Sequence, residues 1–237
     1  MNLNNHSFED ATMKKEIINR TEASKPLLWR GLGRLYPVKT PKWLPVLYPK
    51  RVWHMDRGTR TIYLTFDDGP HPKATPFVLD LLKKYDARAT FFCIGKNAEL
   101  YPEIYARIIR EGHTVGNHTQ QHLNGWKTDT ETYLENITEA EKSIKSGLFR
   151  PPYGRLKSAQ ARKLSRFRII MWDVLSGDFD QTVNAETCLR NVLRHTNNGS
   201  IVVFHDSEKA WQNMSNTLPL VLEHFMKEGF SFAAIPA

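Results

Sequence analysis

From Thr61 to the end of the chain, short apolar runs alternate with longer stretches in which apolar residues recur every three to four positions. The short runs predict buried strands and the longer stretches predict amphipathic helices, the first of which starts at Thr75-Pro76, with Thr as N-cap and Pro at the first helical position. Repeated units of this length imply parallel strands, and about seven of them predict a closed or nearly closed (β/α) barrel. The expected strands are residues 62–64, 90–94, 114–116, 148–149, 169–172, 201–204 and 232–235.

The first predicted strand runs into residues 65–70, Thr-Phe-Asp-Asp-Gly-Pro, where two carboxylates stand side by side. Gly69-Pro70 breaks the strand and turns the chain. Adjacent strand residues point to opposite faces, so we expect Asp67 and Asp68 to have different neighbours and different roles. Burying two adjacent anions also requires a cation or a hydrogen-bond network. The alternative is an acidic turn without chemistry.

Further polar residues follow later predicted strands at the same relative position. In β/α barrels the active site is built at the C-terminal strand ends, so this alignment predicts a site at that rim. The residues are Asp67 and Asp68 after the first strand, His118 and His122 after the third, Arg150 after the fourth, Asp173 and Asp178 after the fifth, and His205 after the sixth.

Two of these residues have the spacing of metal ligands. His118 and His122 are four positions apart, so on a helical turn they would share a face and could hold one ion. With Asp68 they would form a His₂Asp site that leaves a position open for water, whose pKa a catalytic zinc ion lowers to about 7. Asp67 could then act as general base. Zinc is the expected ion, with Co²⁺, Ni²⁺ and Mn²⁺ as alternatives.

Composition adds an excess of positive charge to this picture. The 237 residues are 41% hydrophobic and carry a formal net charge of +8, which favours anionic partners such as acidic glycans or lipid head groups. No nucleic acid is expected as a partner. Cys93 and Cys188 are the only cysteines, so no disulfide framework fixes the compartment. Residues 1–20 lack the apolar region of a secretory signal, and no apolar stretch could span a membrane, so we expect a cytoplasmic or membrane-peripheral protein.

The chain is expected to divide into three parts. Residues 1–24 predict a disordered leader, residues 25–60 a basic arm rich in proline and tryptophan that packs on the barrel, and residues 61–237 the barrel domain. A peripheral contact of the arm with a membrane or an anionic polymer is the alternative. It rests on a leucine face with neighbouring arginines between residues 27 and 35.

Four motifs in this order resemble those of the polysaccharide deacetylases, the NodB-homology family or carbohydrate esterase family 4. They are residues 65–70, the His118/His122 pair, residues 150–154 (Arg-Pro-Pro-Tyr-Gly) and residues 203–205 (Val-Phe-His). The resemblance covers about residues 60 to 235. It implies a distorted or incomplete (β/α) barrel, a divalent metal, and removal of N-acetyl groups from N-acetylglucosamine polymers such as peptidoglycan or chitin. The family often acts outside the cytoplasm.

The resemblance also implies a role for each matched residue. The guanidinium of Arg150 beside the general base Asp67 would hold that carboxylate ionised, whereas an ion pair on the surface would contribute little to stability. The matched residues are Asp67 as general base, Asp68, His118 and His122 as metal ligands, Arg150 as partner of the base, Tyr153 as the residue whose backbone N–H helps to bind the oxyanion, and His205 as general acid.

One further family motif, which lies between the third and the last of these four, is altered in this chain. The family commonly has Asp-Trp there, in which Asp orients the acid histidine and Trp lines the groove. Here Asp178 is followed by Phe179, which keeps an apolar wall but loses the indole donor. We assign the orienting role to Asp178, with Asp173 as the competing candidate.

The sequence therefore predicts a metal-dependent deacetylase of an N-acetylglucosamine-containing polysaccharide. A lipid-linked or soluble amino sugar inside the cell is an alternative substrate, because no secretory signal is seen. A non-catalytic glycan-binding protein on the same fold is the alternative from another class. An intact base, three metal ligands and an acid argue against it, since binding alone requires none of them.

Overall fold

The computed structural model of the chain describes residues 36–237. The leader expected at residues 1–24 and the leucine face at residues 27–35 lie outside the described residues. Residues 37–60 pair with the barrel: one antiparallel bridge joins Lys39 to Val174, and another joins His54 to Ser200. Trp43 is 62% exposed.

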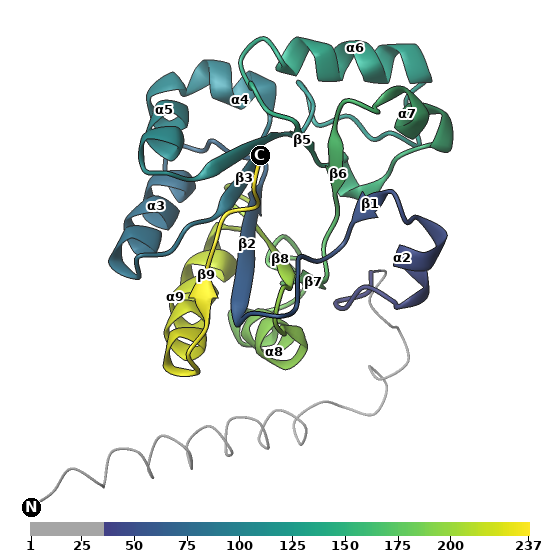
Figure 1. Ribbon diagram of the computed structural model, residues 1–237. Coiled ribbons are helices and arrows are strands. Elements are labelled where there is room, and N and C mark those ends of the chain that lie inside the picture. The colour runs from purple at the N-terminus through teal and green to yellow at the C-terminus, as the bar shows by residue number, and fades with distance from the viewer. Residues whose placement is uncertain (1–35) are drawn as a thin grey trace, which may run out of the picture. The chain divides into compact units, whose positions relative to one another are not determined.

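Within residues 36–237 nine strands form one sheet, in the order β1-β6-β5-β4-β3-β2-β8-β7 with β9 beside β2, and their pairings are parallel (Figure 1). This sheet confirms the predicted distorted (β/α) barrel. The structure adds two strands of two residues each, β1 and β7, to the about seven that the sequence predicts. The strands are β1 (Arg51–Val52), β2 (Thr61–Asp67), β3 (Thr90–Cys93), β4 (Thr114–Asn117), β5 (Leu148–Phe149), β6 (Arg168–Ile170), β7 (Val174–Leu175), β8 (Ile201–His205) and β9 (Ser231–Phe232).

The barrel is distorted where one segment passes from one end of the sheet to the other. Ile170 in β6 pairs with Val52 in β1, whereas Val174 in β7 pairs with Val202 in β8. The sequence predicts one strand over residues 169–172. The chain bends there instead, because β6 pairs with β5 and β1 whereas β7 pairs with β8.

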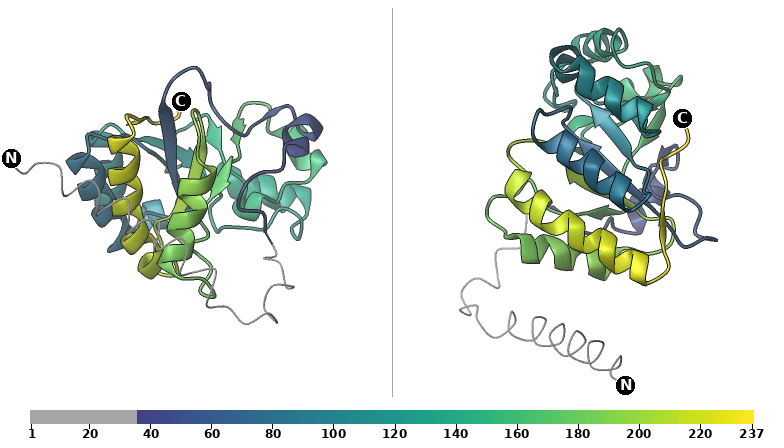
Figure 2. Two further views of the ribbon diagram at one scale, coloured as in Figure 1. Left: turned by 90° about the horizontal axis from the view of Figure 1, so that it is seen from below. Right: turned by 90° about the vertical axis from the view of Figure 1, so that its left-hand side faces the viewer.

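The helices surround the sheet, and Figure 2 shows α8 and α9 side by side on the outside, with α3 against α9. α6 is capped by Asp129 and α8 by Asn184, each accepting from a backbone N–H three residues later. The predicted N-cap Thr75 lies instead inside α3. The helices are α2 (Trp43–Leu47), α3 (Ala74–Lys84), α4 (Gly95–Leu100), α5 (Pro102–Arg110), α6 (Thr130–Ala140), η2 (Pro152–Gly154), α7 (Ser158–Lys163), α8 (Ala185–His195) and α9 (Trp211–Lys227).

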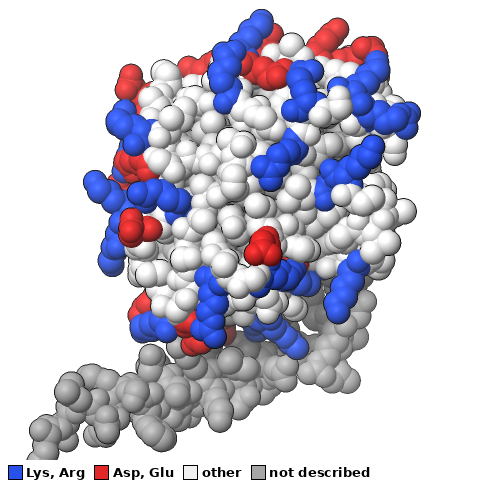
Figure 3. Space-filling model, viewed as in Figure 1, with Lys and Arg blue, Asp and Glu red and all other residues white. Residues whose placement is uncertain are grey.

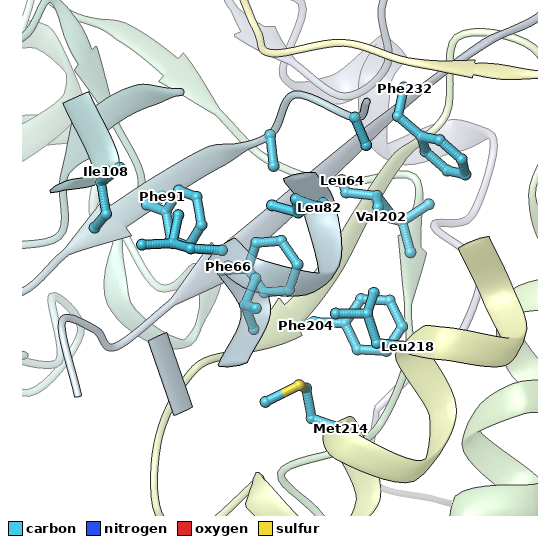
Figure 4. Packing of buried hydrophobic residues seen from close by; sticks show 14 of the residues in the cluster. Leu64, Phe66, Leu82, Phe91, Ile108, Val202, Phe204, Met214, Leu218 and Phe232 are labelled. Atoms are coloured by element: carbon cyan, nitrogen blue, oxygen red, sulfur yellow. The ribbon is translucent and has the colours of Figure 1, made fainter. Parts of the chain in front are cut away.

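The main core lies between the central strands and the helices α3 and α9 (Figure 4). Phe66 of β2 stacks on Phe91 of β3 and Phe204 of β8, with ring centroids 5.1 and 6.1 Å apart. Such aromatic pairs add about 0.5–1.5 kcal/mol each beyond the burial of their area. Because side chains alternate along a strand, this packing turns Thr65 and Asp67 to the opposite face of β2. The core therefore fixes the direction in which the last residue of β2 points.

The excess of basic residues is visible on the molecular surface. Lys and Arg side chains are spread over the face shown in Figure 3 and leave uncharged areas between them. Among the described residues, no helix has the length and apolar character needed to cross a lipid bilayer.

Candidate metal-binding and catalytic site

The turn after β2 holds two adjacent carboxylates in different surroundings. Asp67 ends β2 and contacts Arg150, whereas Asp68 has a left-handed backbone with a φ of 82°. This conformation is uncommon for a residue other than glycine. Asn97 holds it by donating from Nδ2 to the Asp68 carbonyl at 2.7 Å.

A third carboxylate, which sequence reasoning missed, supports this turn. Asp206 is fully buried and accepts from the Gly69 N–H at 3.0 Å and from the Thr75 hydroxyl at 2.5 Å. The hydroxyl contact accounts for the position of Thr75 inside α3. A Cβ on Gly69 would lie 2.0 Å from Asp206 Oδ2, so only glycine fits. Burial raises the pKa of Asp206 to about 8. Its only sequence signal is its position directly after His205.

Asp68, His118 and His122 come together as a possible ligand set. Their ligand atoms all lie within 4.8 Å of one another. Asp68 Oδ1 lies 3.7 Å from His118 Nε2 and 3.2 Å from His122 Nε2. Two imidazole nitrogens and one carboxylate oxygen are the donor types of a catalytic zinc site.

The two imidazoles meet through an irregular loop, and the helical turn predicted from their spacing is wrong. β4 ends at Asn117, and Thr119 and His122 have φ values of 66° and 57°. Asn117 fixes the loop by accepting from the Thr119 N–H at 2.8 Å and by donating to the Ile137 carbonyl at 3.0 Å. The rings of His118 and His122 consequently lie 5.1 Å apart.

The surroundings of both histidines suit a metal ion. Burial, followed by the charge of His122, lowers the pKa of His118 to about 3, and burial also lowers the pKa of His122. His118 Nδ1 donates to the Arg150 carbonyl at 2.8 Å, which leaves the Nε2 lone pair for a ligand. Asp68 Oδ1 is buried and accepts no hydrogen bond from the described part of the chain. A cation would satisfy this oxygen, so the three residues fit a metal.

Arg150 holds Asp67 in a buried ion pair. The guanidinium is completely buried, and its Nη1 lies 2.6 Å from Asp67 Oδ1 and 2.7 Å from Thr65 Oγ1. Nη2 donates to the Met171 carbonyl at 2.9 Å, and the group lies 4.0 Å from the centroid of the Phe92 ring. Burial lowers the pKa of Arg150, but the guanidinium stays charged. The pair is therefore not a surface ion pair, and it keeps the carboxylate oriented.

His205 lies beside Asp67 in the register of β8 with β2. Asp178 accepts from the His205 backbone N–H at 2.7 Å and from Nδ1 at 2.8 Å, and the Phe179 ring lies edge-on to the imidazole at 5.1 Å. Burial acts to lower the pKa of His205. The charge and hydrogen bond of Asp178, with the charges of Asp68 and Asp67, outweigh burial and raise this pKa to about 9. The imidazolium is therefore present at neutral pH.

Asp173, the competing candidate, lies in a different network. Its Oδ2 is 2.7 Å from Lys39 Nζ and 3.2 Å from Arg57 Nη2, and it accepts from the Ser200 hydroxyl at 2.6 Å. Within residues 36–237, Asp173 makes no hydrogen bond or ion pair with His205. Of the two candidate aspartates, Asp178 is therefore the one that holds the imidazole.

Tyr153 lies at the edge of the metal ligands. Its backbone is left-handed, with a φ of 59°, and its ring is 59% exposed and 4.5 Å from the His122 ring. Gly154 follows with a φ of 68°, and a Cβ there would lie 2.7 Å from the Trp172 ring. Two successive left-handed residues turn the chain sharply beside His122.

These residues form adjoining groups at the C-terminal strand ends. A cation site beside a carboxylate held by a guanidinium and beside a protonated imidazole suits a hydrolysis in which water attacks a carbonyl and the leaving group is protonated. The predicted site residues that the structure brings together are Asp67 with Arg150, Asp68 with His118 and His122, His205 with Asp178, and Tyr153 with His122.

Comparisons with known proteins agree on one family. The sequence model named polysaccharide deacetylase matches residues 54–169. A peptidoglycan-N-acetylglucosamine deacetylase of Bacillus cereus is 34% identical over 185 residues, which cover 74% of this chain and 67% of the relative. A chitooligosaccharide deacetylase of Azorhizobium caulinodans is 35% identical over 155 residues, which cover 62% of this chain and 73% of the relative.

A solved structure shows the same fold. The crystal structure of a peptidoglycan N-acetylglucosamine deacetylase in complex with 4-naphthalen-1-yl-N-oxidanyl-benzamide has a TM-score of 0.77 and 32% identity. The match covers 83% of this chain and 95% of that protein.

Proposed function

The chain belongs to the polysaccharide deacetylase family, a family of metal-dependent deacetylases, and we propose that it removes N-acetyl groups from N-acetylglucosamine-containing polysaccharides. The relatives named for peptidoglycan and for chitooligosaccharides support this substrate class. The single observation that carries the proposal is the buried Asp68 Oδ1, which accepts no hydrogen bond within residues 36–237 and faces two imidazole nitrogens beside the Asp67–Arg150 pair.

Asp68, His118 and His122 would hold one divalent ion, and their donor set favours zinc, with Co²⁺, Ni²⁺ and Mn²⁺ as alternatives. When bound, such an ion supplies Lewis acidity toward the acetyl carbonyl and toward water. The two histidines are prepared for this because burial lowers the pKa of each and keeps the ring neutral at pH 7.

Asp67 is the proposed general base. It ends β2 next to Asp68, but its Oδ1 is held by Arg150 rather than by the histidines. The guanidinium fixes the direction of the carboxylate, which can then take the proton of the attacking water.

His205 is the proposed general acid. An amide nitrogen leaves readily only when it is protonated, and the raised pKa of about 9 keeps this imidazole protonated at neutral pH. Asp178 holds the ring by two hydrogen bonds, so its role is orientation. The backbone N–H of Tyr153, at the sharp turn beside His122, is the proposed donor to the oxyanion.

Acetate release tests the proposal. The full chain is incubated with peptidoglycan, chitin oligomers, single amino sugars and a lipid-linked amino sugar, before and after chelation and with each of the four metals added back. We expect release from the polymers, loss of release on chelation, and recovery with zinc.

Two outcomes would refute the proposal in different ways. Release from single or lipid-linked sugars alone would support the alternative substrate class. Binding of the polymers without release under any metal condition would identify a glycan-binding protein on this fold.

A further inference from the structure

A row of flat side chains leads away from the metal ligands. The Tyr153 ring lies 4.5 Å from the His122 ring, and Arg155 Cζ lies 5.9 Å from the Tyr153 ring centroid and 5.2 Å from that of Trp126. The guanidinium thus contacts two aromatic rings. We call Tyr153, Arg155 and Trp126 the arginine platform.

The platform is exposed although its members are large and apolar in part. Trp126 is 61% and Tyr153 59% exposed. Arg155 is half-buried, and within residues 36–237 it has no ion pair with an acidic side chain, in contrast to Arg107, which pairs with two. A cation that lies near two rings and has no anion beside it within the described residues remains able to bind one.

The platform is held in place by its supporting loops. A Cβ on Gly125 would lie 2.3 Å from the Arg155 carbonyl oxygen, so the loop that carries Trp126 packs directly on the Arg155 backbone. Gln160 Nε2 donates to the Gly125 carbonyl at 2.9 Å, and the Trp126 N–H donates to Asn124 Oδ1 at 3.1 Å. The helices that follow these loops, α6 and α7, contact each other in the upper right of Figure 1. A preorganised surface loses less entropy when it binds a ligand.

The chemistry of the platform fits one kind of glycan. Sugar rings present apolar C–H faces that can pack on Trp126 and Tyr153, and a planar guanidinium pairs with carboxylates through two parallel hydrogen bonds. A neutral amino-sugar polymer of the chitin type offers no carboxylate. Peptidoglycan-type glycans carry one on the lactyl group of every second sugar or on the peptide attached to it.

We propose that the arginine platform is a subsite for a carboxylate-bearing glycan segment, so that the polysaccharide processed at the metal site is of the peptidoglycan type. This inference rests on the proposed function, because the platform can serve as a subsite only if the acetyl group of the substrate binds next to His122. Trp126 supplies the packing surface, and Arg155 selects for the charge.

The test compares ligands with and without carboxylates, and the acid and its methyl amide form the closely matched pair. They are a peptide-free tetrasaccharide of alternating N-acetylglucosamine and N-acetylmuramic acid, the same sugar with its lactyl carboxyls converted to methyl amides, the same sugar with intact stem peptides, and chitotetraose. Affinity is measured by calorimetry on the full chain after chelation, and kcat and KM on the metal-loaded full chain. The variants are Arg155→Gln, Arg155→Lys and Trp126→Ala.

Arg155→Gln should weaken binding of the acidic ligands about tenfold to a hundredfold and raise KM accordingly, while the methyl amide and chitotetraose change less than about threefold. Arg155→Lys, which keeps the charge without the planar fork, should give an intermediate loss. Trp126→Ala should weaken all four ligands about threefold to tenfold. A dependence seen with only one acidic ligand would assign the carboxylate to the lactyl group or to the peptide.

Matched controls are Arg110→Gln, an exposed arginine on α5, and Trp43→Ala, which removes a tryptophan that is 62% exposed; neither should change any affinity. Equal effects of Arg155→Gln on the acid and on its methyl amide would overturn the inference. If Arg155→Gln does not fold, Arg155→Lys serves as the test. Undiminished binding of the acidic ligands by Arg155→Lys would also overturn the inference. If the enzyme releases acetate but Arg155→Gln affects acidic and neutral ligands alike, the proposed function holds and the subsite is refuted. If Arg155→Gln weakens only the acidic ligands but no acetate is released, the subsite holds and the proposed function is refuted.

Discussion

Replacing Asp178 with asparagine should remove the rise in the pKa of His205. The fully buried Asp178 carboxylate accepts from the His205 backbone N–H at 2.7 Å and from Nδ1 at 2.8 Å. An asparagine keeps one oxygen for the backbone N–H but turns its NH₂ group toward Nδ1, which can accept that bond only in the neutral ring. We expect the pKa of His205 to fall from about 9 to 6.5 or below.

The size of the effect follows from the raised pKa. A rise from 6.5 to about 9 corresponds to about 3 kcal/mol, at about 1.4 kcal/mol per pKa unit. Because the pKa is raised by folding, the imidazolium stabilises the fold fully below a pH of about 6.5, and this contribution is lost as the pH rises through about 9. The loss of unfolding free energy in Asp178→Asn should therefore be about 3 kcal/mol larger at pH 6 than at pH 10.

NMR titration of the His205 ring in the chelated protein measures the pKa directly, and urea unfolding at both pH values measures the free energy. In the metal-loaded enzyme, kcat/KM of Asp178→Asn should begin to fall at a lower pH on the alkaline side than kcat/KM of the unaltered enzyme. Asp173→Asn is the matched control, because it alters another buried aspartate that contacts Lys39 and Ser200. A His205 pKa that stays near 9 in Asp178→Asn, or falls equally in Asp173→Asn, would refute the reasoning.

Asp67→Asn should keep the metal and lose about 10²-fold in turnover, whereas Asp68→Ala should lose the metal itself. Elemental analysis with acetate release checks both, and equal loss of metal would make both residues ligands. Arg150→Met should lower the free energy of unfolding by about 3–5 kcal/mol, because it leaves the buried Asp67 carboxylate unpaired; a loss below about 1 kcal/mol in denaturant unfolding would contradict this. His205→Ala should cripple cleavage of an N-acetyl amide but spare an activated aryl acetate, whose leaving group needs no proton. Equal loss on both substrates would give His205 another role.

Periodicity was sufficient to predict the barrel, because each long strand carries its own apolar run and the parallel order follows from the alternation with helices. It did not predict β1 and β7, two-residue strands that pair with β6 and β8. The same limit applies to the bend at residues 171–173. That bend depends on which strands the two halves of the segment meet.

The site residues that belong to a sequence motif could be predicted from their spacing, but the residues that hold them in place could not. His118 and His122 were expected on a helix, yet left-handed residues in a loop bring them together, and no apolar pattern records a backbone of this kind. Asp206 could not be predicted because its partners, Gly69 and Thr75, lie far away in the sequence. Trp126 and Arg155 meet for the same reason, through the folding of two separate loops.

The pairing of β2 with β8 has a consequence for the order in which the site is completed during synthesis. Tyr63 pairs with Ile201, so one edge of β2 lacks its β8 partner until residues 201–205 have emerged. All three expected metal ligands are made by residue 122, whereas the acid half of the site waits for residue 205, roughly 4–16 seconds later at about 5–20 residues per second. A nascent or truncated chain that ends between these two residues therefore lacks the proposed acid. During that interval its bare β2 edge is open to pairing with other chains, a hazard that ends when β8 docks.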